Sequence, residues 1–561
     1  MAVNELSPIR TWLKRQTNVM PDGRRSGRWS VGYVTLLGGA LFVSALILLI
    51  PLYLVIRAGS AWAEVAQTLR QPITLQVLGN TILLAVSVVV ATTVIAVLLA
   101  WLVSCTDLPG KKVWTILAAL PLVIPSYVAA FLYISILSPK GLLQQALYPW
   151  LGIERLPNFY GFPGAFLVLT CISYPFTFLT VRVALQRMDP ALVEAARSLG
   201  LSPWCAFWRV TLPYLRPSMV AGGLLVLLYC LRDFGAVTML QYSTFTRVIF
   251  NRYLAYRLDA ATALALALVA LTAVILLLEQ RTRGRARYER LGVGAARAAR
   301  LTPLGRWKWP ALLLVGGVVF WSLLLPASAL LYWLGRGLFQ DWLVAGSGGA
   351  PRNVVTLAAL VGPAWNSFAV SLSGAALTMI LALPVAVLVV RRASRLTRLF
   401  ERLTYASSAL PGIVVALAYV FWSTNYALPL YQKMPVLLLA YVILFIPQAV
   451  GAQRASLLQL PASLEEAGQS LGKSPLTVFR QITWPLIRPG ILAGGALVFL
   501  TCMKELPATL ILSPLGFNTL AMQVWTNVEE AFFARAAAAA LLLLLLSSVP
   551  LAWLTMRDKS A

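Results

Sequence analysis

The sequence predicts an all-α polytopic membrane protein with about 12 transmembrane helices in two similar halves. Of its 561 residues, 59% are hydrophobic and 12% are charged, against about 45–50% and about 25% in ordinary soluble proteins. Apolar runs of about 20 residues, long enough to cross a bilayer, recur along the chain. A polar segment between such runs also occurs twice in nearly the same form. Together these three observations indicate a duplicated membrane domain.

Two basic segments divide the chain. A tail (1–32) precedes a first half (33–279), and a linker (280–308) leads to a second half (309–561). The first apolar run is too long for a signal peptide and is expected to be an uncleaved span. The expected spans are about 33–57, 78–104, 113–137, 162–187, 217–241, 259–279, 309–335, 364–390, 405–425, 435–456, 490–512 and 534–556.

The net charge of +27 is explained by topology. The basic residues lie in short segments between apolar runs, namely the tail, the linker and the loop at 391–402. Such segments face the cytoplasm, so both termini of this multi-pass protein are expected there. The lipid bilayer is the expected partner, and no nucleic acid is.

The two copies of the polar segment define an internal duplication. Residues 194–217 and 466–489 align without a gap at an offset of 272, and 12 of the 24 aligned positions are identical. Upstream, Leu120-Pro121 is matched with Leu410-Pro411 at an offset of 290, which leaves 18 extra residues in the first half. Six spans in each half give both halves the same orientation, about a pseudo-twofold axis along the membrane normal.

Each copy lies in a longer polar stretch, here called the first island (189–217) and the second island (461–489). In the first island, Asp189 and Ser202 are expected N-caps, Gly200 ends the first helix, and Pro213 stops the second. The equivalent residues of the second island are Pro461, Ser474, Gly472 and Pro485. We expect each island to be a helix, a glycine hinge and a helix, roughly parallel to the membrane and suited to a partner's groove.

The chain lacks the usual chemistry of an enzyme. It has no histidine, and its five cysteines have no metal-binding spacing. Residues 468–474 have three residues between two glycines, whereas a phosphate-binding loop needs four after a strand. We therefore expect no catalytic residue and no cofactor in this chain, with any ATP used by partner subunits.

The islands resemble the signature of the membrane subunits of bacterial ABC importers, whose coupling-helix region seats on ATPase subunits. The first island fits at Glu194, Ala195, Ala196, Gly200, Val210, Leu212 and Pro213. The second fits at Glu466, Ala467 and Gly472, and it departs at Gly468 and Trp484. By this resemblance these Glu, Ala and Gly residues couple the chain to its ATPases.

Residues 232–243 and 503–517 are similar to those of fused two-half permeases of ferric-ion importers. The resemblance covers both halves but not the tail or the linker. It implies a type I ABC importer permease fold in a bacterial inner membrane, two copies of an ABC ATPase subunit and one soluble binding protein. Fused thiamine permeases and polyamine or phosphonate permeases share this layout, so these cargoes stay open beside ferric iron.

Two carboxylates are candidate residues of the transport path. Asp233 and Glu505 occupy equivalent positions, 16 residues after the last proline of each island. Ionisable groups within spans are costly and often mark an ion path, and hard oxygen donors suit a ferric ion. The alternative is a structural pairing with basic residues, since Arg232 and Lys504 precede them.

Two other function classes are compatible with parts of this pattern. A secondary transporter can also have twelve spans in two similar halves, but it needs no ATPase and more naturally carries coupling charges near the midplane. The duplicated islands argue against it. A membrane scaffold or receptor is disfavoured by the duplicated carboxylates.

An aromatic-rich segment lies in the extra loop of the first half. It holds Tyr148, Trp150, Phe159, Tyr160 and Phe162. Such residues usually anchor a protein at the membrane interface, and contact with a binding protein is the second interpretation.

Overall fold

The fold is all-α, as the sequence predicts. A computed structural model describes residues 31–282, 302–344, 355, 357–392 and 394–558. Most of the predicted basic tail and linker lies outside the described residues. Within those ranges the chain forms helices, joined by loops and one isolated bridge between Thr106 and Thr302.

The elements follow in chain order, with η marking short 3-10 or π turns. The first half contains α2 (Val31–Ser60), α3 (Trp62–Arg70), α4 (Pro72–Cys105), α5 (Lys111–Ala119), η1 (Leu120–Val123), α6 (Ser126–Leu137), α7 (Leu142–Leu151), α8 (Phe162–Arg187), α9 (Pro190–Ser198), α10 (Pro203–Ala206), η2 (Phe207–Thr211), α11 (Leu212–Arg232), α12 (Gly235–Met239), α13 (Phe245–Leu254) and α14 (Leu258–Thr282). The second half contains η3 (Gly305–Trp307), α15 (Lys308–Val319), η4 (Phe320–Leu324), α16 (Leu325–Val344), α17 (Leu357–Arg391), α18 (Arg395–Ala406), η5 (Ser407–Ala409), α19 (Gly412–Tyr426), η6 (Leu428–Leu430), α20 (Met434–Leu458), α21 (Ala462–Ser470), α22 (Pro475–Val478), η7 (Phe479–Thr483), α23 (Trp484–Met503), α24 (Pro507–Leu512), α25 (Leu520–Glu529) and α26 (Phe533–Asp558).

The described residues contain ten helical segments long and apolar enough to cross a membrane. A pair bent by 105°, 395–409 followed by α19, makes an eleventh, and α26 stands where the twelfth was expected. Four expected spans are broken. The segments at 113–137 and 405–425 are interrupted at the 3-10 turns η1 and η5, and those at 217–241 and 490–512 end as α11 and α23 near their far ends. Hydropathy missed these breaks because apolar residues continue on both sides of each of them.

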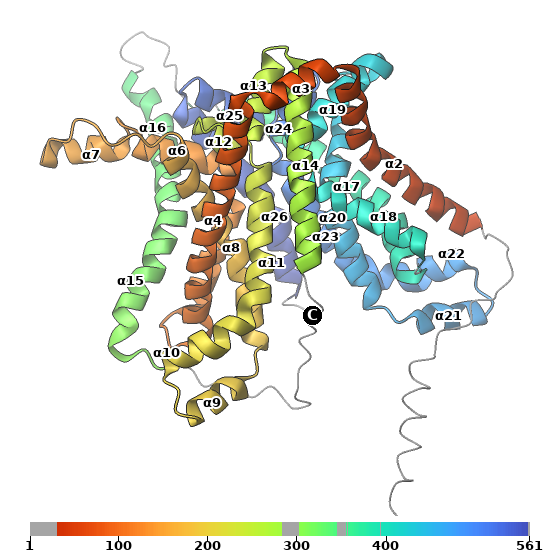
Figure 1. Ribbon diagram of the computed structural model, residues 1–561, viewed down its shortest axis with the longest axis horizontal. Coiled ribbons are helices and arrows are strands. Elements are labelled where there is room, and N and C mark those ends of the chain that lie inside the picture. Colours follow the sequence, from red (N-terminus) through yellow and green to blue (C-terminus); the bar gives the residue numbers. More distant parts are fainter. Residues whose placement is uncertain (1–30, 283–301, 345–354, 356, 393, 559–561) are drawn as a thin grey trace, which may run out of the picture.

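The two islands lie on the same face of the bundle. Figure 1 shows α9 and α10 at the bottom and α21 and α22 at the lower right, while α3, α13 and α25 cover the opposite end. We call these two ends the island face and the far face. The equal orientation expected of the two halves is therefore seen in their islands.

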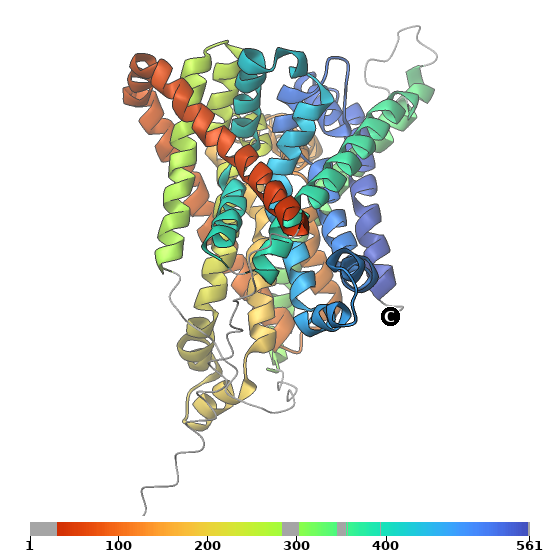
Figure 2. The ribbon, with the colours of Figure 1, turned by 90° about the vertical axis from the view of Figure 1, so that its right-hand side faces the viewer.

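The first span of each half packs on the other half. Helix α2 contacts α17, α18 and α19 of the second half, and it crosses the bundle diagonally in Figure 2. Conversely, α15 and α16 contact α5 and α6 of the first half. Tyr133 Oη donates to the carbonyl oxygen of Trp321, and the hydroxyl oxygens of Tyr174 and Ser322 lie 3.4 Å apart. The first span of each half is therefore packed on the opposite half, and these contacts join the two halves.

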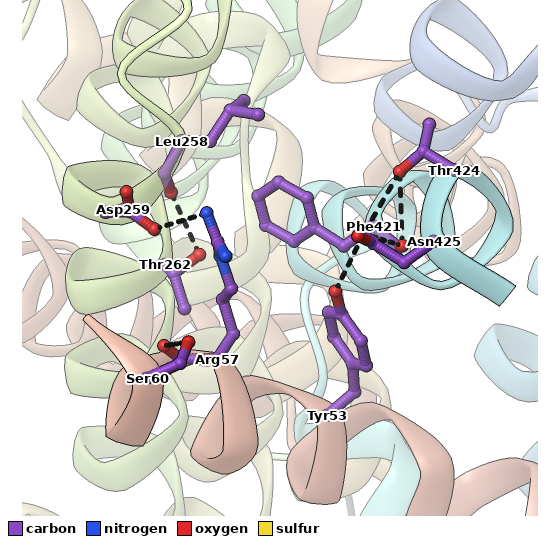
Figure 3. Close-up of polar contacts among 9 residues, drawn as sticks. All are labelled: Tyr53, Arg57, Ser60, Leu258, Asp259, Thr262, Phe421, Thr424 and Asn425. Atoms are coloured by element: carbon purple, nitrogen blue, oxygen red, sulfur yellow. Dashed lines mark hydrogen bonds and ion pairs between the residues drawn. The ribbon is translucent and has the colours of Figure 1, made fainter. Parts of the chain in front are cut away.

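One turn of α2 fixes its position near the far face (Figure 3). Tyr53 and Arg57 are four residues apart and therefore lie on one side of the helix. Arg57 Nη2 lies 2.8 Å from Asp259 Oδ1 on α14 of its own half. Asn425 Nδ2 on α19 of the other half donates to Tyr53 Oη at 3.3 Å. A single helix face thus contacts both halves.

The start of the second half contacts the loop that follows α4. Asp107 accepts a hydrogen bond from the Leu304 amide at 2.8 Å, and Lys308 Nζ lies 2.9 Å from its other carboxylate oxygen. The backbone donor and, after it, Lys308 hold the pKa of Asp107 below its ordinary value.

The repeat extends to individual hydrogen bonds at the far face. The Phe245 amide donates to Thr81 Oγ1 at 3.2 Å, and the Leu520 amide donates to Ser367 Oγ at 2.7 Å. The neighbours Asn80 and Asn366 donate to the carbonyl oxygens of Ser243 and Asn518 at 3.2 and 3.0 Å. Two equivalent pairs of hydrogen bonds therefore join α4 to the start of α13 and α17 to the start of α25.

The structure corrects the alignment upstream of the islands. Pro125 and Pro411 are the residues that precede α6 and α19, and each follows a 3-10 turn. They are 286 residues apart, so against the island offset of 272 the first half holds 14 extra residues between Pro125 and its island rather than 18. The extra residues include α7, which corresponds in position to the short turn η6.

Equivalent glycines allow close helix crossings in each half. A Cβ on Gly494 of α23 would lie 2.5 Å from Ala452 Cβ on α20, and one on Gly222 would lie 2.6 Å from Thr177 Cα. Small residues at such crossings let membrane helices approach closely.

We predict that Gly494→Ala destabilises the protein and that Gly495→Ala does not. Overpacking costs about 1–3 kcal/mol, whereas a Cβ on Gly495 would meet its nearest neighbour, Met379 Cγ, at an ordinary 3.7 Å. Alanine raises helix propensity at both sites. A lower midpoint of thermal unfolding for Gly494→Ala alone would therefore show that the close approach of α23 to α20 needs glycine. Equal midpoints for the two variants would contradict this packing.

Candidate coupling surface and helix breaks

The first island folds as expected up to its second helix. Asp189 Oδ1 accepts the Ala191 amide at 3.0 Å and so caps α9, which begins at Pro190. Gly200 has a φ of 86° and its equivalent Gly472 a φ of 79°, a left-handed conformation that favours glycine. The Ser474 hydroxyl caps α22 by accepting the Thr477 amide at 3.2 Å. Each island therefore turns sharply at its glycine.

The expectation that Pro213 and Pro485 stop the second helix of each island is wrong. Helix α10 passes through the π turn η2 into α11, and α22 passes through η7 into α23. A proline breaks the regular hydrogen bonding of the preceding turn, and a single π turn of this kind accommodates the break. Each island is consequently continuous with a membrane-spanning helix.

The islands expose most of the residues predicted to couple. Glu194, Ala195, Glu466 and Ala467 are exposed, as are both hinge glycines. Beside the hinges, Leu199 and Leu471 are 85% and 83% exposed. Ala196 is the exception, since it is buried inside the first island. The exposed set forms an acidic and apolar surface on the island face.

The departure of the second island at position 468 has a packing reason. Gly468 is the equivalent of the buried Ala196, and a Cβ on it would lie 2.8 Å from Ile482 Cδ1 and 3.0 Å from Val478 Cγ2. The residues equivalent to these two are the smaller Val210 and Ala206. A smaller residue on one helix therefore compensates for larger ones on the next, and the island keeps its shape.

Asp233 caps a short helix at the first break. Its Oδ1 accepts the amides of Ala236 and Val237 at 3.0 and 3.3 Å, at the start of α12. Ser126 on α6 lies beside this buried carboxylate. The signal that we missed was an N-capping residue before a short helix-forming stretch.

Glu505 has the same role at the second break. Its Oε1 accepts the Ala508 amide at 3.2 Å, at the start of α24. The residue facing it is Gly412, the equivalent of Ser126, and a Cβ there would lie 2.5 Å from Glu505 Oε1. The longer carboxylate thus faces glycine, and the shorter one faces serine.

Two basic residues make reciprocal contacts between the halves. Arg232 Nη1 donates to the carbonyl oxygen of Ser408 at 3.2 Å, and Lys504 Nζ donates to that of Leu122 at 3.5 Å. Arg232 is equivalent to Lys504 by the offset of 272, and Leu122 to Ser408 by the offset of 286. Both carbonyls belong to the 3-10 breaks before α6 and α19. Arg232 also lies close enough to Glu505, the carboxylate of the other half, to interact with it electrostatically. The structural pairing of a carboxylate with a basic residue therefore stays open beside these backbone contacts.

Aromatic side chains fill the interface beside the first break. The rings of Phe234 and Trp525, from different halves, stack with centroids 5.2 Å apart. Phe250 packs edge-on against Phe234 at 4.8 Å. Among the described residues no group of three or more Cys, Asp or Glu side chains is placed to hold a metal ion. The arrangement at the breaks therefore consists of capped helix ends, two cations and aromatic packing.

We predict that Gly412→Ala destabilises the protein and that Glu505→Asp in the same chain restores part of the loss. The shorter carboxylate vacates the space that the added methyl needs, so the two substitutions should couple by about 0.5–3 kcal/mol in a double-mutant cycle. Unfolding midpoints of the wild type, both single variants and the double variant measure this coupling. Additive effects would show that the two residues do not touch.

Comparisons with known proteins agree with this architecture. The family model of the binding-protein-dependent transport system inner membrane component matches residues 108–281 and 374–560. A Fe(3+)-transport system permease protein of Haemophilus influenzae is 34% identical over 510 residues, 89% of this chain and 94% of that protein. The sulfate transport system permease protein CysT of Escherichia coli is 30% identical over 253 residues, 44% of this chain and 90% of that protein.

A third relative covers a shorter stretch. The molybdenum transport system permease protein of Escherichia coli is 34% identical over 137 residues, 24% of this chain and 58% of that protein. The family model matches one segment in each half, and each segment contains one island and the helix break that follows it. The chain therefore belongs to the family of binding-protein-dependent transport system inner membrane components, and it carries the family's membrane domain twice.

Proposed function

We propose that this chain is the transmembrane permease of an ATP-driven importer of ferric iron. The choice of ferric iron as the cargo rests on the sequence identity of 34% with an iron permease over nearly the whole of both chains. The exposed, duplicated islands support the attachment of two ATPase subunits, one for each half. A binding protein would deliver the cargo at the far face, and the island face with both termini would lie in the cytoplasm.

The geometry supports a direct mechanical route from an island to the interface. Each island continues through its π turn into a membrane helix, and α11 and α23 end at the two helix breaks. The 21 residues of α11 rise about 30 Å at 1.5 Å per residue. A displacement of either island by ATP binding in the partner would therefore reach Arg232 or Lys504. Release of the reciprocal contacts would let the two halves part.

A second cargo class is favoured by one observation. At the ends of α11 and α23, two cations donate to backbone carbonyls of the opposite half, and the carboxylate after each of them caps a helix on its own side. Cations suit an oxyanion better than a bare ferric ion, and sulfate and molybdenum transport permeases are among the relatives. Sulfate and molybdate are therefore the appropriate competing cargoes in a transport assay.

We predict ATP-dependent uptake of ferric iron by proteoliposomes that contain this chain, its ATPase subunits and its binding protein. Uptake of radioactive iron, sulfate and molybdate is measured with each cargo presented on the binding protein, and thiamine, a polyamine and a phosphonate complete the panel. Iron alone should be accumulated. Accumulation of an oxyanion instead would move the cargo to the second class, and ATP-independent uptake would contradict an ATP-driven importer.

We also predict that the double variant Glu194→Ala, Glu466→Ala retains less ATPase subunit on purification. These exposed carboxylates are expected to meet basic groups of the partner, and loss of a paired charge at an interface weakens binding about tenfold or more. The double variant Glu154→Ala, Glu530→Ala removes two acidic residues outside the islands and is the matched control. Equal retention by both double variants would exclude Glu194 and Glu466 from the contact.

A further inference from the structure

The second island is held by a polar network that the first island lacks. Arg391, the last residue of α17, places its Nε 3.0 Å from Glu465 Oε2, and its Nη2 donates to Glu465 Oε1 at 3.1 Å. Nη1 and Nη2 both donate to the carbonyl oxygen of Leu460 at 3.3 Å. Thr483 Oγ1 completes the network by donating to Glu465 Oε1 at 2.9 Å.

This network connects three elements at one point. Glu465 lies on α21, Thr483 ends the π turn η7, and Leu460 lies in the loop that enters the island. Both charged side chains are only 19% accessible. A bidentate guanidinium–carboxylate contact fixes the relative orientation of the two side chains as well as their distance. Partial burial limits the screening of this ion pair by salt. The first helix of the second island is therefore fixed to the end of α17.

The first island contacts the equivalent span, α4, through aromatic packing of its second helix and not through an ion pair of α9. The residues equivalent to Arg391 and Glu465 are Cys105 and Val193, which cannot form an ion pair. Aromatic contacts take their place, with the rings of Trp101 and Phe207 5.8 Å apart and Trp204 stacked on Phe207 at 5.9 Å. Such contacts are less directional than a two-pronged ion pair.

Helix α17 links this network to the rest of the second half. Near its middle, the carbonyl oxygen of Met379 accepts Gln453 Nε2 of α20 at 2.7 Å. Near its other end, Ser367 accepts the Leu520 amide at the far face. From Ser367 to Arg391 the helix rises about 36 Å, so it spans the membrane as a single element.

We propose that Arg391 and Glu465 are positioning residues that transmit movement of the second island to α17. The two islands then differ in how they couple, because only the second is joined to its span by a directional ion pair. This inference rests on the proposed function, in which ATPase subunits move the islands. The attachment of α21 to α17 by the Arg391–Glu465 ion pair, here called the tie, does not depend on the partner subunits.

Two measurements separate the tie from the coupling. The first is hydrogen exchange of segment 462–470 in the purified chain in lipid nanodiscs. The second is the ratio of cargo transported to ATP hydrolysed in proteoliposomes of the complete transporter, with ferric iron on the binding protein as the probe. The variants are Arg391→Met, Glu465→Gln and the charge reversal Arg391→Glu, Glu465→Arg. Arg395→Met removes an exposed charge nearby and is the matched control.

We expect both single variants to raise exchange in 462–470 by about tenfold, since local opening sets the exchange rate. Transport per ATP should fall several-fold in the same variants, the charge reversal should recover part of both losses, and the control should match the wild type. Unchanged exchange would overturn the tie, and faster exchange with an unchanged transport ratio would overturn its role in coupling. Failure of the wild-type complex to couple ATP to uptake would contradict the proposed function, while the exchange result would still test the tie.

Discussion

Backbone groups inside a membrane must be satisfied within the protein, and this structure depends on how that requirement is met at two helix breaks. Helices α11 and α23 end before the far face, which leaves the amides of the next short helices without regular partners. Asp233 and Glu505 accept those amides. Arg232 and Lys504 donate hydrogen bonds to backbone carbonyl oxygens at the 3-10 breaks of the opposite half. The breaks and the interface between the halves are therefore stabilised by the same four residues.

The two halves keep one design through compensating changes rather than through identity. Asp233 faces Ser126, whereas the longer Glu505 faces Gly412. Inside the islands, Ala196 is replaced by Gly468, whose neighbours Val478 and Ile482 are larger than their equivalents. Each pair conserves volume, which is what close packing demands. The islands differ most in how they are attached, by aromatic packing in the first and by the Arg391–Glu465 pair in the second.

The sequence was sufficient for the fold class and for the islands, because hydropathy, a gapless repeat and residues such as Asp189 and Gly200 act locally. It was insufficient where partners come from distant segments. Proline was expected to stop a helix at Pro213, but a π turn keeps the chain helical through it. Asp233 and Glu505 were read as possible ion ligands, and the structure shows them as helix caps, which leaves their part in transport a proposal. Arg391 and Glu465 are 74 residues apart, and no local pattern connects them.

The central claim is that movement of the islands and movement of the two halves are one event. It is tested most directly by the distance between spin labels at Arg197 and Gln469, equivalent exposed positions of the two islands, in the complete transporter. Double electron–electron resonance would compare the nucleotide-free state with a state trapped with a non-hydrolysable ATP analogue. The account predicts a shorter distance between the islands in the trapped state. One unchanged distance distribution in both states would contradict it.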